Sequence, residues 1–63
     1  METLLRKVIK DRDGIDDAEF DALVEEAADA LEAGEDPDDI LHETFSIEPD
    51  FVFDLIEEVQ KLA

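Results

Sequence analysis

The sequence predicts an all-α fold, a compact bundle of about four short helices. In four segments the apolar residues recur every three or four positions, which is the spacing of one helix face. No window alternates apolar and polar residues with a period of two, so no strand is expected. The connections between these segments are short, which favours neighbouring helices packed antiparallel or at steep angles around one core. With 63 residues, the chain is expected to form a single acidic helical domain, residues 1–63.

Two helices are expected in the first half of the chain. The first covers residues 2–11 and ends at the turn formed by residues 11–14. Its apolar positions are Leu4, Leu5, Val8 and Ile9. The second covers residues 17–33, and Gly34 is well placed as its C-terminal stop. Its apolar stripe consists of Phe20, Leu23, Val24, Ala27 and Leu31.

Two further helices are expected in the second half. A short one covers residues 37–45, with Asp36 as its N-cap and Pro37 at the first helical position. The last covers residues 49–62 and has the strongest helical periodicity in the chain. Its apolar face consists of Phe51, Val52, Leu55, Ile56, Val59 and Leu62.

The charge balance excludes some classes of partner. Twenty-one Asp and Glu residues against five Lys and Arg give a net charge of −16 at neutral pH. A polyanion of this kind is repelled by nucleic acid and by anionic lipid, so direct binding to either is not expected. Because 44% of the residues are apolar, the chain is nevertheless expected to fold. With no cysteine, no secretory signal and no membrane-spanning segment, a cytoplasmic location is expected.

Catalytic and metal chemistry have little support in the sequence. His42 is the only histidine, and Asp38 lies one turn before it in the predicted third helix. Two ligands do not make a metal site, and a single histidine without cysteine leaves no convincing nucleophile and base. We therefore expect no enzyme activity, no cofactor and no metal.

Residues 11–20 resemble the calcium-binding loop of the EF-hand family in their second half, where Ile15, Asp16, Glu19 and Phe20 keep that family's relative positions. The resemblance implies a calcium-responsive helix pair. The spacing departs from the family pattern, because a full loop places its first Asp and its last Glu eleven positions apart, whereas Asp11 and Glu19 are eight apart, so three residues are missing. The same letters also predict a helix N-terminus, with Asp16 as the cap, Glu19 closing the capping box and Ile15 packing on Phe20.

Residues 45–56 resemble the turn and second helix of DNA-binding helix-turn-helix proteins. Ile47, Val52, Leu55 and Ile56 occupy that family's core positions. Where the family presents basic or amide side chains to DNA, this segment presents Glu48, Asp50, Asp54 and Glu57. The resemblance therefore implies a similar shape with the opposite charge, and an ordinary pair of helices joined by a turn explains the pattern as well.

The charges are unevenly distributed along the chain. Residues 1–12 contain four basic and two acidic side chains, whereas residues 13–63 contain one basic and nineteen acidic side chains. Two rows of carboxylates follow helical spacing: Asp21, Glu25, Asp29 and Glu32 in the second helix, and Asp50, Asp54 and Glu57 in the fourth. Like charges one turn apart destabilise a helix by about 0.2–0.5 kcal/mol per pair, which indicates a role other than folding.

The scale of the molecule suggests what that role is. A compact domain of this length has a radius of gyration near 11 Å and spans roughly 27 Å. Duplex DNA of that length carries about 16 charges, which matches the net charge of the chain. Phe53 falls at the edge of the apolar arc of the fourth helix, where an exposed aromatic ring beside carboxylates would anchor a contact.

The sequence thus predicts a non-enzymatic inhibitor whose acidic helical face mimics the nucleic-acid backbone and blocks a basic groove on a nucleic-acid-binding protein or complex. In size and charge it is similar to small phage-encoded DNA mimics, including anti-CRISPR and anti-restriction proteins. The expected contact residues are Asp21, Glu25, Asp29, Glu32, Asp50, Phe53, Asp54 and Glu57. The alternatives are a small acidic adaptor of antitoxin, viral-assembly or halophile-adapted type that uses a hydrophobic edge, and the calcium module. The sequence does not predict an oligomeric state.

Overall fold

A computed structural model describes residues 2–62 of the chain and confirms the all-α fold. Its helices are α1 (Leu4–Asp13), α2 (Asp17–Glu32), α3 (Pro37–Thr44) and α4 (Val52–Leu62), with a short 3-10 turn, η1 (Pro49–Phe51), directly before α4. No strand occurs within residues 2–62. Across the same residues, no helix has the length and apolar composition that crossing a bilayer requires. The predicted helix bounds are close, except that residues 49–51 form η1 rather than the first turn of α4.

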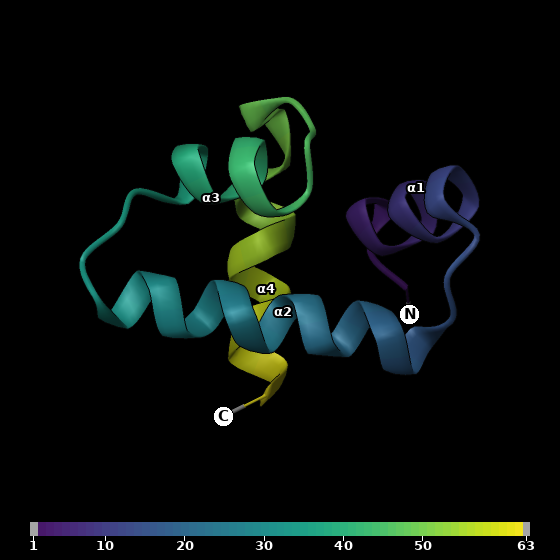
Figure 1. Ribbon diagram of the computed structural model, residues 1–63, viewed down its shortest axis with the longest axis horizontal. Coiled ribbons are helices and arrows are strands. Elements are labelled where there is room, and N and C mark those ends of the chain that lie inside the picture. Colours follow the sequence, from purple (N-terminus) through teal and green to yellow (C-terminus); the bar gives the residue numbers. More distant parts are fainter. Residues whose placement is uncertain (1, 63) are drawn as a thin grey trace.

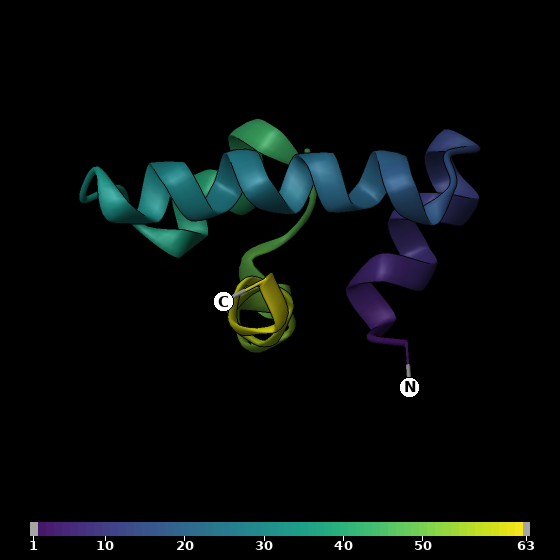
Figure 2. The same ribbon diagram turned by 90° about the horizontal axis from the view of Figure 1, so that it is seen from below.

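The helices pack around a single centre. The radius of gyration is 10.5 Å and the longest extent is 29 Å, close to the values expected from chain length. The long helix α2 runs across α4, with α1 beside the N-terminal end of α2 and α3 beside its C-terminal half (Figures 1 and 2). This arrangement puts α1 and the connection between α2 and α3 at opposite ends of the molecule (Figure 1).

The helix ends follow the sequence signals closely. Asp16 caps α2 by accepting a hydrogen bond from the Glu19 backbone N–H at 2.9 Å, as predicted. Gly34 follows the end of α2 with a φ of +95°, a conformation that side chains with a Cβ rarely adopt. Pro37 begins α3 as predicted, although the Asp36 side chain forms no capping hydrogen bond. Local chemistry therefore fixes where α2 ends and α3 begins.

The core draws on all four helices. It contains an aromatic pair, Phe20 of α2 and Phe45, which directly follows α3, with ring centroids 5.8 Å apart. The fully buried apolar residues are Leu5, Ile9, Phe20, Val24, Ala27, Ile40, Leu41, Phe45 and Leu55. Three residues predicted on apolar faces are instead substantially exposed: Leu4, Ile56 and Leu62. Two of them, Ile56 and Leu62, lie on α4, whose buried side carries Leu55 and Glu58.

Glu58 is the central polar group of the interior, with 1% of its surface exposed. The Arg6 guanidinium of α1 donates to both Glu58 carboxylate oxygens, at 3.1 and 2.9 Å, and the Thr3 hydroxyl donates at 2.6 Å. Arg6 also lies over the Phe20 ring, 4.7 Å from its centroid. The hydrogen bonds from Arg6 hold the pKa of Glu58 below its usual value, and Glu58 in turn raises the pKa of Arg6. Within the described residues no buried side-chain polar atom lacks a partner.

Because Arg6 and Glu58 form a buried ion pair, we expect Glu58→Gln to destabilise the protein at neutral pH. We expect the free energy of unfolding to fall by about 2 kcal/mol, somewhat less than for most broken buried pairs, because Arg6 keeps Asp17 and Asp21 as partners. Since the folded pKa of Glu58 is lowered, its contribution is complete above the unfolded value near 4.3 and is lost as the pH falls through the folded pKa. Urea denaturation followed by circular dichroism at pH 7, 5 and 3 measures the difference.

Glu57→Gln is the matched control. Glu57 is exposed, and its carboxylate lies 3.5 Å from the Lys61 ammonium. Loss of this surface ion pair should change the free energy of unfolding by less than about 0.5 kcal/mol at pH 7. A Glu58→Gln effect no larger than this control, or one that persists unchanged at pH 3, would contradict the assigned role of the pair.

Candidate functional site

Three of the four basic side chains of α1 are engaged within the molecule, whereas Lys7 is exposed and forms no ion pair in the described structure. Lys10 binds Glu2 at 2.8 Å and Asp17 at 3.0 Å, and these hydrogen bonds raise the pKa of Lys10 and lower that of Asp17. Arg6 binds Asp17, Asp21 and Glu58, as described above for the interior. Arg6 and Lys10 therefore hold α1 against α2, and Arg6 also holds it against α4.

Arg12 ties α1 to the end of α3. Its guanidinium donates to the backbone carbonyls of Phe45 at 2.6 Å and Ser46 at 2.9 Å. It also forms a two-point pair with Asp13, with both N–O distances at 2.9 Å, and this pair lowers the pKa of Asp13. Because carbonyls at a helix C-terminus carry partial negative charge, the guanidinium stabilises that end of α3.

One long stretch of the chain contains no positive charge to balance its carboxylates. We call residues 22–50 the acidic end; it contains eleven Asp and Glu residues and no Lys or Arg. All eleven are exposed, and none forms an ion pair in the described structure. They are Glu25, Glu26, Asp29, Glu32, Glu35, Asp36, Asp38, Asp39, Glu43, Glu48 and Asp50.

Most of these carboxylates project from helices that the core holds in place. Val24 and Ala27 of α2 and Ile40 and Leu41 of α3 are fully buried, so each helix is fixed along its inner face while its outer face carries the carboxylates. A carboxylate on such a helix has only its own side-chain freedom to lose on binding. The acidic end is therefore a preorganised anionic surface.

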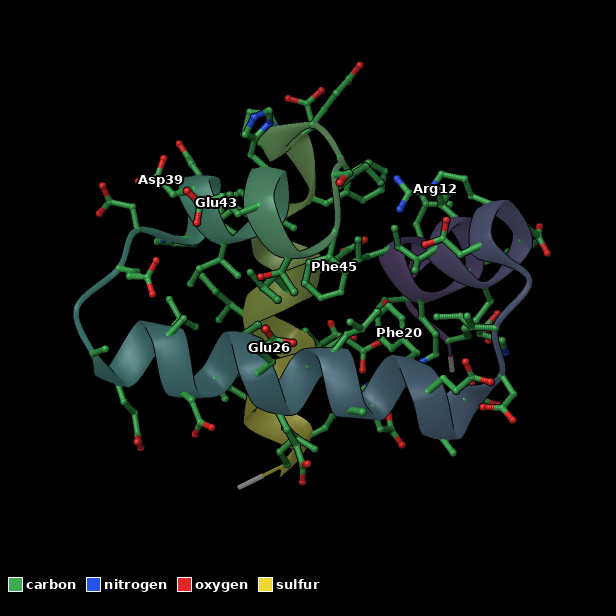
Figure 3. All side chains as sticks on the ribbon, in the orientation of Figure 1. Arg12, Phe20, Glu26, Asp39, Glu43 and Phe45 are labelled. Carbon is green, nitrogen blue, oxygen red and sulfur yellow. The ribbon has the colours of Figure 1, made fainter. Side chains whose placement is uncertain are left out.

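Between α2 and α3 the acidic end forms a groove of about 510 Å³. Glu26 and Asp29 line it from α2, Glu43 lines it from α3, and Glu35 lines it from the connection between them. Ala30, Ile40 and Thr44 complete the lining. Figure 3 shows Glu26 on α2 and Glu43 on α3 on the two sides of the groove, with Asp39 one turn before Glu43 on α3. An apolar wall rimmed by carboxylates suits the aliphatic stem and charged head of a Lys or Arg side chain.

The structure places the predicted contact residues of α2 in two environments. Glu25, Asp29 and Glu32 are exposed and belong to the acidic end. Asp21, predicted in the same row, is half-buried and binds Arg6 at 2.6 Å. The predicted row therefore contributes three free carboxylates and one that stabilises the fold.

The predicted contact residues near α4 also divide. Asp50 is exposed and unpaired within the described residues, and Phe53 is 85% exposed. Asp54 is half-buried and accepts a hydrogen bond from the Leu5 backbone N–H at 3.1 Å, so it helps to cap α1. Glu57 is exposed beside Lys61. Asp54, like Asp21, thus supports the fold, while Asp50 and Phe53 remain accessible.

Sequence reasoning missed the carboxylates that line the groove, namely Glu26, Glu35 and Glu43. They do not form a row on one helix; they come together only because α2 packs on α3. The one local signal was the like-charge pair Asp39 and Glu43 one turn apart in a short helix, a spacing that destabilises the helix.

The two segments with family resemblances have plain structures. Residues 11–13 belong to α1 and residues 17–20 to α2, so only residues 14–16 connect the helices and no calcium-type loop forms. Residues 45–56 form the connection from α3 through η1 into α4, with Leu55 buried and Ile47 and Val52 half-buried, as predicted. Within residues 2–62, no group of three or more metal-ligating side chains is placed to hold an ion.

Comparison with known proteins adds no precedent for the site. No family model matches the chain, and no match was found among curated proteins or solved structures.

Because the carboxylates of the acidic end have no positive charge beside them, we expect that neutralising some of them stabilises the fold. Glu26→Gln combined with Glu43→Gln should raise the melting temperature by about 2 °C at 20–50 mM salt, because it removes repulsion across the groove. The gain should vanish in 1 M NaCl, where the Debye length is only about 3 Å. Thermal unfolding followed by circular dichroism at both salt concentrations provides the measurement.

Asp17→Asn serves as the comparison, because Asp17 is an exposed carboxylate that pairs with Arg6 and Lys10. It should lower the melting temperature. If the groove variant were instead destabilised at low salt, its carboxylates would be satisfied by partners within the fold, contrary to the charge distribution described here.

Proposed function

We propose that this protein is a non-enzymatic inhibitor that uses its acidic end to occupy the basic nucleic-acid groove of a partner protein. The observation that carries the proposal is the set of eleven exposed carboxylates without an ion pair, all within residues 22–50. A DNA duplex as long as the 29 Å extent of the molecule carries about 17 charges, close to the net charge of the protein. The match in charge density supports a backbone mimic.

The mechanism is electrostatic competition. A basic groove attracts the acidic end over several ångströms, which raises the association rate at low salt. On contact, Lys and Arg side chains of the partner pair with Glu25, Asp29 and Glu32 along α2, and one enters the groove between α2 and α3. Because the carboxylates stand on packed helices, little ordering entropy is lost. Nucleic acid and this protein then exclude one another from the same groove.

The size and charge fit an anti-defence protein of the phage type, directed against a CRISPR effector or a restriction enzyme. Such targets present long basic channels to nucleic acid, which a small rigid anion blocks without any chemistry of its own. The absence of cysteine fits action in the reducing cytoplasm, where those targets work. This assignment rests on the size and charge of the protein, and identification of its partner tests it.

Partner binding should be salt-sensitive and competitive with DNA. Immobilised protein should retain nucleic-acid-binding proteins from a bacterial lysate, and a duplex oligonucleotide or 0.5 M NaCl should release them. For a purified partner, Glu25→Gln with Glu32→Gln should weaken binding at least tenfold and flatten the dependence of log Kd on log salt. Biolayer interferometry at several salt concentrations measures both quantities.

Asp11→Asn with Glu19→Gln is the matched control, since it changes the charge equally at two exposed carboxylates outside the acidic end. Its affinity should stay within about twofold of the native protein, because general electrostatics falls off beyond a Debye length. Equal losses for both variants, or binding indifferent to salt and DNA, would contradict a mimic that uses the acidic end.

A second candidate function is an adaptor that docks through a hydrophobic edge, and Phe53 is the observation that favours it. Its ring is 85% exposed on α4, whose opposite face is anchored by Leu55 and Glu58. Large aromatic side chains held on a rigid element are frequent anchors of protein interfaces. In this function the carboxylates maintain solubility, and affinity comes from apolar burial.

Phe53→Ala separates the two functions. In an adaptor, it should weaken partner binding at least thirtyfold with no change in the salt dependence, because truncation of an aromatic anchor costs about 2 kcal/mol or more. In a backbone mimic, it should weaken binding by less than about tenfold while the salt dependence stays steep. The melting temperature should hardly change in either case, since the ring packs on so little of the protein.

A further inference from the structure

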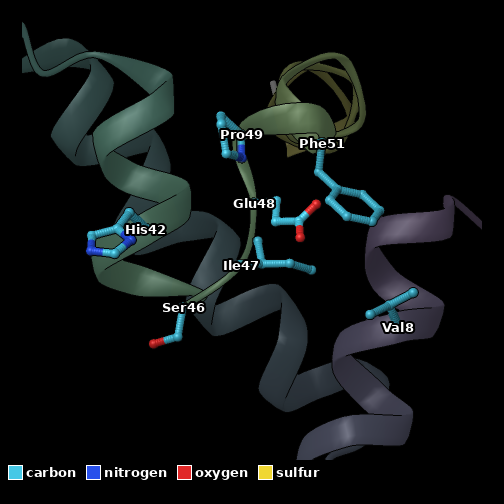
Figure 4. Close-up of a pocket in the computed structure, with 7 residues that line it drawn as sticks. All are labelled: Val8, His42, Ser46, Ile47, Glu48, Pro49 and Phe51. Carbon is cyan, nitrogen blue, oxygen red and sulfur yellow. The ribbon is translucent and has the colours of Figure 1, made fainter.

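A second concave surface is separate from the groove between α2 and α3 and shares no lining residue with it. It is an open hollow of about 760 Å³ between α1 and the connection from α3 to η1, which we call the α1 hollow. Val8 lines it from α1, while Ile47, Glu48 and Phe51 extend toward α1 from the connection and η1 (Figure 4). His42, Ser46 and Pro49 complete the lining.

The apolar walls of the α1 hollow are incompletely covered by the chain itself. Val8, Ile47 and Phe51 are each half-buried and line the hollow, and Ile47 and Phe51 also pack against the core. Leu4 lies one helical turn before Val8 on α1 and is 60% exposed, so the apolar surface continues along that helix. A concave surface of this composition resembles the sites that receive a large apolar side chain.

The α1 hollow is formed before any ligand arrives. Arg12 holds the backbone carbonyls of Phe45 and Ser46, and the Ile47 backbone N–H donates to the Leu41 carbonyl at 3.1 Å. Ser46 has a φ of +51°, an uncommon conformation for a residue with a Cβ, and it turns the chain sharply at this point. The wall that carries Ile47 and Glu48 is therefore fixed by contacts within the protein.

The charge around the α1 hollow indicates which ligand it favours. Glu48 lines it with an exposed carboxylate that has no ion pair in the described structure. Arg12 contacts this wall at the Phe45 and Ser46 carbonyls, and its charge is already balanced by its two-point pair with Asp13. A carboxylate among apolar side chains complements an ammonium or guanidinium placed next to an apolar group.

We propose that the α1 hollow binds a peptide segment in which a large apolar side chain stands next to a Lys or Arg. The apolar side chain enters between Val8, Ile47 and Phe51, and the basic side chain pairs with Glu48. The inference does not rest on the proposed function: of the carboxylates in residues 22–50 it uses Glu48, and none of those that line the groove between α2 and α3, although one basic partner would satisfy both surfaces.

The test is a two-dimensional ¹⁵N–¹H NMR titration of the full chain with three capped dipeptides: acetyl-Leu-Lys-amide, acetyl-Leu-Glu-amide and acetyl-Ala-Lys-amide. Acetyl-Leu-Lys-amide should shift the amide signals of Val8, Ile47 and Glu48 at concentrations up to about 10 mM, the range for a ligand this small. Each of the other two peptides should bind at least fivefold more weakly, because one lacks the cation and the other lacks the apolar side chain.

Glu48→Gln provides the second arm, with Asp50→Asn as its matched control on a neighbouring exposed carboxylate. Glu48→Gln should remove the preference for acetyl-Leu-Lys-amide over acetyl-Leu-Glu-amide, whereas Asp50→Asn should preserve it. The proposal is overturned if the Val8, Ile47 and Glu48 signals do not move. It is also overturned if acetyl-Ala-Lys-amide shifts them as strongly, or if the amide signals of Glu26, Asp29 and Glu43 in the groove between α2 and α3 shift equally.

Discussion

The ion pair between Arg6 and Glu58 is the contact on which the rest of the structure depends. It joins α1 to α4 in the interior, and Arg6 reaches Asp21 of α2 and the Phe20 ring at the same time. A buried carboxylate is costly unless it is fully bonded, and here Arg6 and Thr3 satisfy it. The chain has only five basic residues. The pair places the charge of one of them inside the fold, where it does not balance the carboxylates of residues 22–50.

Arg6, Lys10, Arg12 and Lys61 all pair with carboxylates outside residues 22–50, so the ion pairs of the described residues leave the carboxylates of that segment unbalanced. Their mutual repulsion weakens the fold at low salt, and the core of α2 and α3 must offset it. A surface kept at such a cost is typical of a binding site, where stability and function oppose each other. The groove between α2 and α3 gives this surface a shape as well as a charge.

Much of the fold could be predicted because its signals are local. The periodicity of apolar residues located all four helices, and Asp16, Gly34 and Pro37 marked their ends where the structure has them. Glu58 could not be predicted, since a carboxylate beside an apolar stripe is normally exposed; only the approach of Arg6 from α1 makes its burial possible. Because Glu58 takes part of the buried face of α4, Ile56, which was predicted on that face, is 37% exposed.

The candidate site shows the same division between local and long-range information. Helical spacing was enough to find Glu25, Asp29 and Glu32, which are exposed. It could not show that Asp21 and Asp54 are held by Arg6 and by the Leu5 N–H, because both partners lie on α1.

The most direct test of the central claim, that the acidic end is an ordered anionic surface at low salt, is native-state amide hydrogen exchange in 20 mM and 1 M NaCl. If the core holds α2 and α3 against their own repulsion, the buried-face amides around Val24, Ala27 and Leu41 stay protected at both salt concentrations. If those amides exchange at unfolded-chain rates in 20 mM NaCl and gain protection only in concentrated salt, the carboxylates are an adaptation to salt, and the account is contradicted.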